Sequence, residues 1–350
     1  MKCTPFLFLL LPFTSNAQGL VGHEPQNRTA LLEEYAAIHC GNCPPSHGLA
    51  DNLLLAYPGT LTAVELHGGA LSVPGAGEPD FRSTWSLGFW SYYAIASQPR
   101  GAVNRIPVSG QVILYTNQWA SEIQNTLALP SPVNIGLASS FDPGPRTLTV
   151  DVELYYTGDS PGGNDRISVL LKEDHIIGYQ QDYINGAQSA YDHKNILRAY
   201  LTDMWGEEVT TTIAGTTVTR TYTFTVPTEW NIANCNVVAL VGEYQGELYQ
   251  ARAVAADAGT TTAIAVVGAD VSRIAYPLPA DQEVRIPLLA SDAVRGMVIH
   301  DLTGREVRRL SIQGGATEAV VDVSDLRNGT YAYTFFPINS SGAGRLVVVH

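Results

Sequence analysis

The first third of the chain alternates short apolar runs with segments whose apolar residues recur at helical spacing. Leu49, Leu53 and Leu54 lie on one face of a predicted helix, and the apolar runs on either side of it have the length of strands. The expected elements are a strand from Leu31, a helix over 46–57, a strand over 61–66, a helix over 81–96, a strand after Pro99, a strand over 112–115 and a helix over 118–129. This order predicts an α/β domain over residues 20–130.

The period of the pattern changes to two beyond Pro130-Ser131-Pro132, where two prolines break the chain. Apolar and polar residues now alternate, as in strands with one buried face. The expected strands are 133–137, 148–156, 167–173, 219–226 and 237–244. They predict a β-sandwich domain over residues 131–256.

Two polar and aromatic segments, 180–183 and 191–198, interrupt this sandwich pattern. One interpretation is a binding loop that includes His193 and Arg198. The simpler interpretation is that these two side chains tie a long insertion to the sandwich by hydrogen bonds.

The last part of the chain predicts a second, smaller all-β module. An Ala-, Gly- and Thr-rich stretch provides a linker, which we assign to residues 257–272, and the module would span 273–350. Within it, Thr303-Gly304 and Asn328-Gly329 are typical of tight turns between strands. The overall expectation is an α/β domain followed by two all-β sandwich modules.

Composition and charge restrict the cellular location and the binding partners that can be expected for this chain. Its net charge of -13 opposes binding to nucleic acid, and only 15% of its residues are charged, which favours β-rich extracellular modules. Residues 1–17 resemble a signal peptide, with Lys2, an apolar core and small residues before a cleavage site after Ala17. No later segment is apolar for long enough to span a membrane. We therefore expect export through the periplasm to a secreted or outer-membrane surface location.

Cys40 and Cys43 are the main candidate for chemistry. A Cys-x-x-Cys that follows a strand and opens a helix can form a reversible disulfide, and the helix N-terminus stabilises a thiolate. Strand, cysteine loop, helix and strand form the first half of a thioredoxin-type unit. Pro99 is expected to form a cis peptide bond and to face Cys40, with the loop after His67 beside the same cleft. Cys235, in an apolar strand, is expected to be a buried thiol.

Two nearby side chains are candidates for tuning the cysteines. Glu34 lies six residues before Cys40, the offset at which thioredoxins place a buried acid that relays a proton to the resolving thiol. The alternative is an ordinary edge carboxylate, since Glu33 and Glu34 point to opposite faces of the strand. His39 is a second candidate, as a protonated imidazole lowers a neighbouring thiol pKa, and the alternative is a polar residue at the rim.

Other interpretations of the cysteines remain open. Pro44 and Pro45 place the helix start at the prolines rather than at Cys40, so less of the helix-end field reaches the first sulfur, and the pair would then be a structural disulfide. Histidines 39, 47 and 67 near the two cysteines also suit copper or zinc as a minor alternative. We expect no cofactor.

The C-terminal landmarks resemble the sorting domain of type IX secretion substrates in Bacteroidota. They are Pro277-Leu278-Pro279, Asp301-Leu302-Thr303-Gly304-Arg305, Asp325-Leu326-Arg327-Asn328-Gly329-Thr330-Tyr331 and the Val-rich end after Arg345. Leu278 departs from the usual Asn between the prolines, and His350 from the usual basic end. The resemblance implies the type IX secretion machinery as a partner.

The first 255 residues resemble the thioredoxin-like outer membrane protein family of Bacteroidota that is named for a twenty-eight-kilodalton member. The supporting segments are Leu32-Glu33-Glu34-Tyr35, Cys40-Gly41-Asn42-Cys43-Pro44, Val103-Asn104-Arg105, His193-Lys194-Asn195-Ile196-Leu197-Arg198 and Trp205-Gly206-Glu207. This family implies a location in the envelope or at the surface, with redox and adhesion roles both considered.

Two functional hypotheses follow. The first is thiol–disulfide exchange on an envelope or secreted protein, with Cys40 as the attacking and Cys43 as the resolving thiol, and Glu34 and Pro99 as further site residues. The second is a surface binding or adhesion protein whose disulfide is structural, with His39, His67, His193 and Arg198 as candidate binding residues. An exposed Cys40 sulfur would favour exchange, and a sealed one would favour the structural disulfide.

Overall fold

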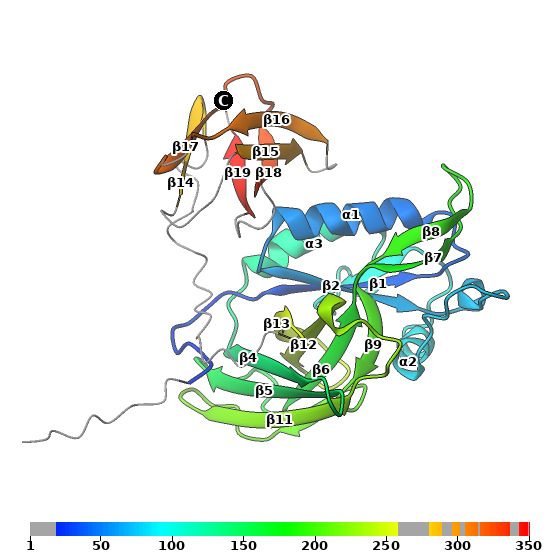
Figure 1. The fold of residues 1–350 in the computed structure, drawn as a ribbon. Coiled ribbons are helices and arrows are strands. Elements are labelled where there is room, and N and C mark those ends of the chain that lie inside the picture. Colours follow the sequence, from blue (N-terminus) through cyan, green and yellow to red (C-terminus); the bar gives the residue numbers. More distant parts are fainter. Residues whose placement is uncertain are drawn as a thin grey trace, which may run out of the picture.

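The computed structural model describes residues 19–257, 280–288, 296–301, 305–313, 316–336, 343–348 and 350. The expected signal peptide and nearly all of the expected linker lie outside these residues. The described chain is a β-rich mixed α/β structure with several sheets (Figure 1).

The N-terminal part supplies the helices and three strands of the largest sheet. Strands β1 and β2 run parallel and are connected through α1, and β3 pairs antiparallel with β1. The elements are β1 (Ala30–Ala36), α1 (Cys43–Ala56), β2 (Leu61–His67), α2 (Thr84–Tyr92), β3 (Arg100–Val103) and α3 (Thr116–Leu127). Helices α1 and α3 pack on one face of these strands through Leu53, Trp119 and Ile123, whereas α2 packs on the other face through Phe89 and Trp90.

The second part continues the same sheet instead of forming a separate one. The sheet order is β13-β12-β6-β9-β2-β1-β3, with β10 paired to β6. The remaining strands are β4 (Val133–Asp142), β5 (Thr147–Tyr156), β6 (Asp165–Glu173), β7 (Ile176–Gln180), β8 (Gln188–His193), β9 (Ile196–Tyr200), β10 (Glu207–Val209), β11 (Thr217–Thr225), β12 (Cys235–Gly242) and β13 (Leu248–Ala255). The expected boundary at residues 130 and 131 therefore separates two stretches of sequence that share one sheet.

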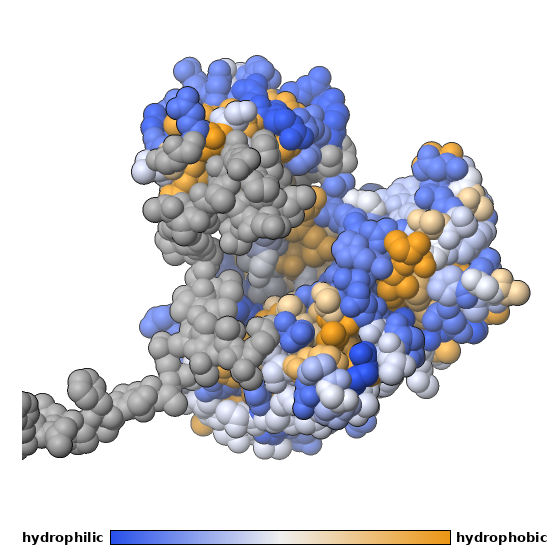
Figure 2. All heavy atoms as spheres, in the orientation of Figure 1, coloured by the Kyte–Doolittle hydropathy of each residue, from blue (hydrophilic) through white to orange (hydrophobic). Residues whose placement is uncertain are grey.

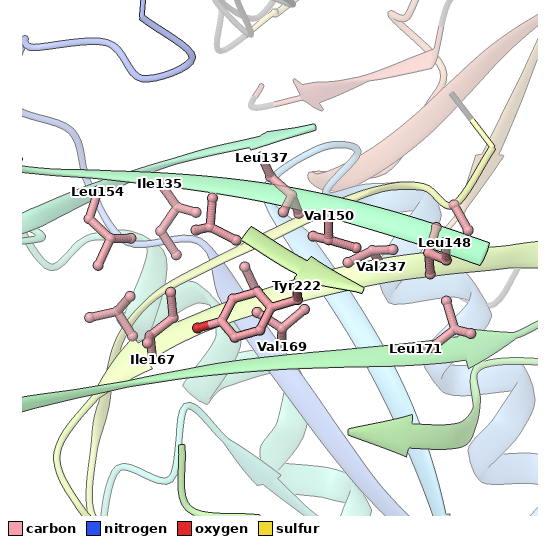
Figure 3. Packing of buried hydrophobic residues seen from close by; sticks show 14 of the residues in the cluster. Ile135, Leu137, Leu148, Val150, Leu154, Ile167, Val169, Leu171, Tyr222 and Val237 are labelled. Carbon is pink, nitrogen blue, oxygen red and sulfur yellow. The ribbon is translucent and has the colours of Figure 1, made fainter. Parts of the chain in front are cut away.

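A second layer, the sheet β11-β5-β4, covers the β6, β10 and β12 end of the large sheet. Alternate residues of the two layers interdigitate in an apolar core, which includes Val150, Leu154, Val169, Leu171 and Val237 (Figure 3). The alternation of buried and exposed positions along β5 is the expected sandwich pattern.

The edge strand β13 returns to the start of β1. Asn104 makes this connection: its Oδ1 accepts the amide of Leu31 at 2.6 Å, and its Nδ2 donates to the carbonyl of Leu248 at 3.2 Å. The backbone amide of Leu248 in turn donates to the carbonyl of Asn104 at 2.8 Å. These bonds join the two parts of the chain beyond the shared ladder.

The C-terminal part contains two small antiparallel sheets around a core of its own. Strand β14 pairs with β17, and the other sheet has the order β16-β15-β18-β19. The strands are β14 (Glu283–Pro287), β15 (Gly296–Asp301), β16 (Glu306–Ser311), β17 (Glu318–Asp322), β18 (Gly329–Phe336) and β19 (Ala343–Val348). Its core includes Ile286, Ile299, Val321, Tyr333 and Leu346. The Thr303-Gly304 turn lies outside the described residues.

Two sequence predictions differ from the structure. Residues 112–115 form only an isolated bridge between Leu114 and Gly101, because the chain turns at Ser109 and Gly110 and crosses the edge of β3 at a single point. The expected insertion at 180–198 is not a loop. It forms the β7–β8 hairpin and the sheet strand β9.

Candidate functional site

Cys40 and Cys43 form a disulfide between the end of β1 and the start of α1, with their Cα atoms 5.4 Å apart. Helix α1 begins at Cys43, with Pro44 and Pro45 in its first turn, as the prolines predicted. Cys40 lies before the N-cap residue Asn42 and is therefore outside the helix, whereas Cys43 is its first residue.

The β7–β8 hairpin covers this disulfide loop. The amide of Gln181 donates to the carbonyl of Ile38 at 2.7 Å, and that of Tyr183 donates to Gly41 at 2.9 Å. The Gln180 side chain donates to the carbonyl of Cys40 at 3.2 Å. The ring of Tyr183 lies so close to Gly41 that a Cβ there would fall 2.3 Å from it, so a larger residue at this position would displace the ring.

Both cysteines are consequently buried, with 3% of Cys40 and none of Cys43 exposed. By the criterion of sulfur access, this closed arrangement favours a structural disulfide. Exchange with a protein partner requires the hairpin to move.

The loop after β2 borders the disulfide, as predicted. The amide of His39 donates to the carbonyl of Leu71 at 3.0 Å, and its Nε2 lies 2.7 Å from the Glu78 carboxylate. Hydrogen bonds from the Gly75 amide and from His39 lower the pKa of Glu78. His39 is thus a partly exposed rim residue that pairs with an acid.

Glu33 and Glu34 point to opposite faces of β1, and both are buried, so neither is an exposed edge carboxylate. Glu33 forms two hydrogen bonds with Arg105, at 2.9 and 2.6 Å, on the face covered by α2. Glu34 faces α1, where Ser46 donates to its Oε1 at 2.6 Å. Since Ser46 also hydrogen-bonds the carbonyl of Cys43 at 2.7 Å, Glu34 connects to the turn that holds the disulfide.

Glu65 joins Glu34 in a buried polar cluster that the sequence analysis missed. It sits opposite Glu34 in the parallel β1–β2 ladder. Its Oε1 lies 2.5 Å from Nε2 of His67 and 3.4 Å from Nε2 of His47, and His47 Nε2 is 4.0 Å from Glu34. A charged residue in the middle of an apolar strand was the available signal, because such a residue is seldom buried without partners.

Burial sets the electrostatics of this cluster. Loss of water raises the pKa of Glu34 well above its ordinary value, and the neighbouring Glu65 raises it further, against the hydrogen bond from Ser46. Burial also raises the pKa of Glu65. The same loss of water lowers the pKa of His47, and it lowers that of His67 to about 3 and that of His193 to about 4. The cluster therefore favours protonated carboxyls and neutral imidazoles.

The candidate binding residues His67, His193 and Arg198 are not grouped at one surface. His193 ends β8, and its buried ring packs against Phe81 and His67 while its Nε2 lies 3.1 Å from the carbonyl of Tyr179. Arg198 lies in β9, 3.1 Å from Glu173, with Trp230 beneath its guanidinium. His193 thus bonds within the β7–β8 hairpin itself, and Arg198 forms an ion pair with the sandwich strand β6 through Glu173.

The Gln98–Pro99 peptide bond is cis, as predicted, and directly precedes β3. The expected position of Pro99 opposite Cys40 stays a prediction. Cys235 is a buried free thiol, also as predicted, and burial raises its pKa to about 12.

Metal ligation finds no support in the geometry of the described residues, where no three His, Cys, Asp or Glu side chains are grouped to hold an ion. In the same part of the chain, no helix is long and apolar enough to cross a membrane. Figure 2 shows a largely hydrophilic face with small hydrophobic patches.

Two family models match different parts of the chain. Residues 88–259 match the family described as outer membrane protein Omp28, and residues 274–348 match the secretion system C-terminal sorting domain. No curated protein matches the chain.

Solved structures extend the comparison. HBP35 of Porphyromonas gingivalis aligns over 93% of this chain and 99% of its own, with 16% identity and a TM-score of 0.55, which shows a similar fold. A domain of the outer membrane lipoprotein Omp28 from the same organism covers 36% of this chain and 89% of its own at 20% identity, with a TM-score of 0.26. A protein from Agrobacterium tumefaciens covers 67% of this chain and 98% of its own at 12% identity, with a TM-score of 0.43.

Proposed function

We propose that this protein performs thiol–disulfide exchange on a protein partner. Its match to the Omp28 outer membrane protein family over residues 88–259 and to the secretion sorting domain over residues 274–348 indicates a secreted or outer-membrane surface location for this reaction. The type IX machinery would deliver the protein. In this proposal residues 20–130 form a thioredoxin-like unit, with Cys40, Cys43, Glu34 and Pro99 as its site residues.

The observation that carries the proposal is the buried carboxyl beneath the disulfide. Glu34 is 3% exposed and reaches the first turn of α1 through Ser46. A disulfide that only fastens a loop needs no such group, and burying ionisable side chains costs folding free energy. A raised pKa is the property that a proton relay near neutral pH requires.

The exchange step follows from these positions. In the reduced protein, the Cys40 thiolate attacks one sulfur of a partner disulfide, that S–S bond breaks, and the departing sulfur takes the electron pair and then a proton. Cys43 then gives its proton to Glu34, which must be in its ionised form for this step, and attacks the Cys40 sulfur. The S–S bond between Cys40 and the partner breaks, and the partner sulfur takes the electron pair and then the proton from Glu34. The reduced partner leaves, and the Cys40–Cys43 disulfide forms again.

A mixed-disulfide trap tests this proposal. With Cys43→Ser, the attack by Cys40 still occurs but release does not, so a covalent complex with the partner should accumulate in the envelope fraction. Cys40→Ser, the matched control, should trap nothing. If neither variant traps a partner and both lose the same small stability, at the low end of about 2–4 kcal/mol for a short disulfide loop, exchange is excluded.

The second candidate is a surface binding protein with a structural disulfide, which the burial of Cys40 favours. Tyr183 and Ile184, which are 70% and 75% exposed at the hairpin tip, provide an apolar contact surface for that role. The outcome with no trapped complex selects this candidate.

A further inference from the structure

One side chain connects the hairpin that covers the disulfide to the buried carboxylates. The hydroxyl of Tyr191, in β8, lies 2.9 Å from Nδ1 of His47, in the second turn of α1. The two rings are also in contact, with centroids 5.7 Å apart. Tyr191 is half-buried, so this bond lies between the outer surface of the hairpin and the interior.

The other nitrogen of the same imidazole faces the carboxylates. Nε2 of His47 is 3.4 Å from Glu65 and 4.0 Å from Glu34. His47 is 8% exposed, and α1 and β2 enclose it together with the covering hairpin. One ring therefore contacts both the cover of the disulfide and the proposed proton relay.

Few other hydrogen bonds hold the covering hairpin near the disulfide. They run from Gln180, Gln181 and Tyr183 to residues 37–41. The tip beyond them is exposed, and β7 and β8 pair only with each other (Figure 1). The base of the hairpin is anchored by Tyr179, which packs on the cluster that contains Phe81, and by the buried ring of His193. Opening should therefore begin near the exposed tip, where each lost hydrogen bond lowers its cost.

We propose that Tyr191 and His47 are positioning residues that couple the covering hairpin to the Glu34–Glu65 pair and thereby regulate access to the disulfide. The hairpin cannot leave Cys40 without breaking the Tyr191–His47 bond and admitting water to the carboxylates. Uncovering of the sulfur and hydration of the proton relay then occur as one event. This inference rests on the proposed exchange function, because it describes how that site would open.

Reduction of the disulfide by dithiothreitol in the full-length chain tests the coupling. Tyr191→Phe keeps the ring but removes the hydroxyl, so the hairpin should open more often and the disulfide should be reduced about threefold faster or more, the effect of one lost hydrogen bond. Amide exchange at Gln181 and Tyr183 should accelerate by a similar factor. His47→Gln provides a second variant with the same expected direction.

Tyr179→Phe is the matched control, since its hydroxyl lies in the same hairpin but bonds only Gln181 among the described residues. It should be reduced at the wild-type rate. Equal rates for Tyr191→Phe, Tyr179→Phe and the wild type, with unchanged amide exchange, would overturn the coupling. Faster reduction of Tyr191→Phe together with no trapped partner for Cys43→Ser would support the coupling and exclude the exchange function.

Discussion

Glu34 and Glu65 occupy opposed positions of the parallel β1–β2 ladder, and both carboxyls are buried. Two carboxylates in one dry site repel each other, so the pair holds a proton more readily than either group would alone. The pair lies between the disulfide turn, through Ser46, and the covering hairpin, through His47 and Tyr191. The protonation state of the Glu34–Glu65 pair should therefore affect both the stability of the fold and the rate of thiol–disulfide exchange.

Replacing Glu34 with Gln separates these two properties. The amide can still accept the hydrogen bond from Ser46, and it removes the repulsion with Glu65, so the free energy of unfolding should change by less than about 1 kcal/mol. Exchange near neutral pH should become slower, because Gln cannot carry a proton. Denaturant unfolding and single-turnover exchange with a model disulfide peptide check the two parts, and an unchanged exchange rate would contradict the relay.

The neighbouring substitution, Glu33→Gln, should behave in the opposite way. It leaves the Arg105 guanidinium buried, 3% exposed, without a full counter-charge. Breaking a buried ion pair from one side costs about 3 kcal/mol. Urea unfolding should show that loss, and any exchange defect should disappear under conditions where the variant is fully folded. A loss as small as that of Glu34→Gln would contradict this account.

The histidine cluster predicts a loss of stability on acidification. The pKa of His193 is about 4 in the folded protein because the ring is buried, against 6.5 as its ordinary value. The unfolded chain therefore binds the proton first, so this contribution to stability is present above pH 6.5 and is lost as the pH falls toward 4. The slope is at most about 1.4 kcal/mol per pH unit for one such group.

His67, whose pKa is also lowered, acts in the same direction. Glu34 and Glu65 act in the opposite direction: because burial raises their pKa values, their contribution to stability is present below the ordinary carboxyl pKa near 4.5 and is lost as the pH rises. His193→Gln should flatten the slope of the unfolding free energy between pH 6.5 and 5, measured by urea titration. A slope equal to that of the wild type would show that His193 is not held neutral.

Deleting residues 273–350 should separate folding from display. The C-terminal sheets enclose a core of their own, and the cores around β1–β13 include none of their residues. The shortened protein should keep its unfolding midpoint within a few degrees but should no longer reach the surface of a cell with an intact type IX system. Surface proteolysis of intact cells measures display, and continued display of the shortened protein would contradict the sorting role.

Periodicity predicted the three α-helices and eight of the strands, β1–β6, β11 and β12, because each of those segments contains its own pattern. The exceptions depend on contacts that are distant in sequence. β9 is a short strand that joins β2 through the pairing of Glu65 with Ile196, which are more than a hundred residues apart. A local sequence pattern cannot predict such a distant partner. The β7–β8 hairpin was missed for a similar reason. Its polar residues contact the disulfide loop of Cys40, which is distant in sequence, and so they show no local strand pattern.

The candidate site was predictable to the same extent. The spacing of Cys40 and Cys43 and the offset of Glu34 are local, and Glu34 in β1 connects to the disulfide turn through the hydroxyl of Ser46. The roles of Glu65 and Tyr191 depend on which strands adjoin, so sequence alone could not assign them. His193 and Arg198 were chosen for their residue type, yet their partners, the Tyr179 carbonyl and Glu173, hold the fold together.

The reduction potential of the Cys40–Cys43 pair is the most direct test of the exchange proposal. It is measured by equilibrating the full-length protein with glutathione or dithiothreitol buffers and labelling the free thiols. Exchange predicts a value between about -120 and -270 mV, the range of thiol–disulfide oxidoreductases. A value more negative than about -300 mV, which is typical of structural disulfides, would contradict exchange and leave the pair as a covalent link in a surface binding protein.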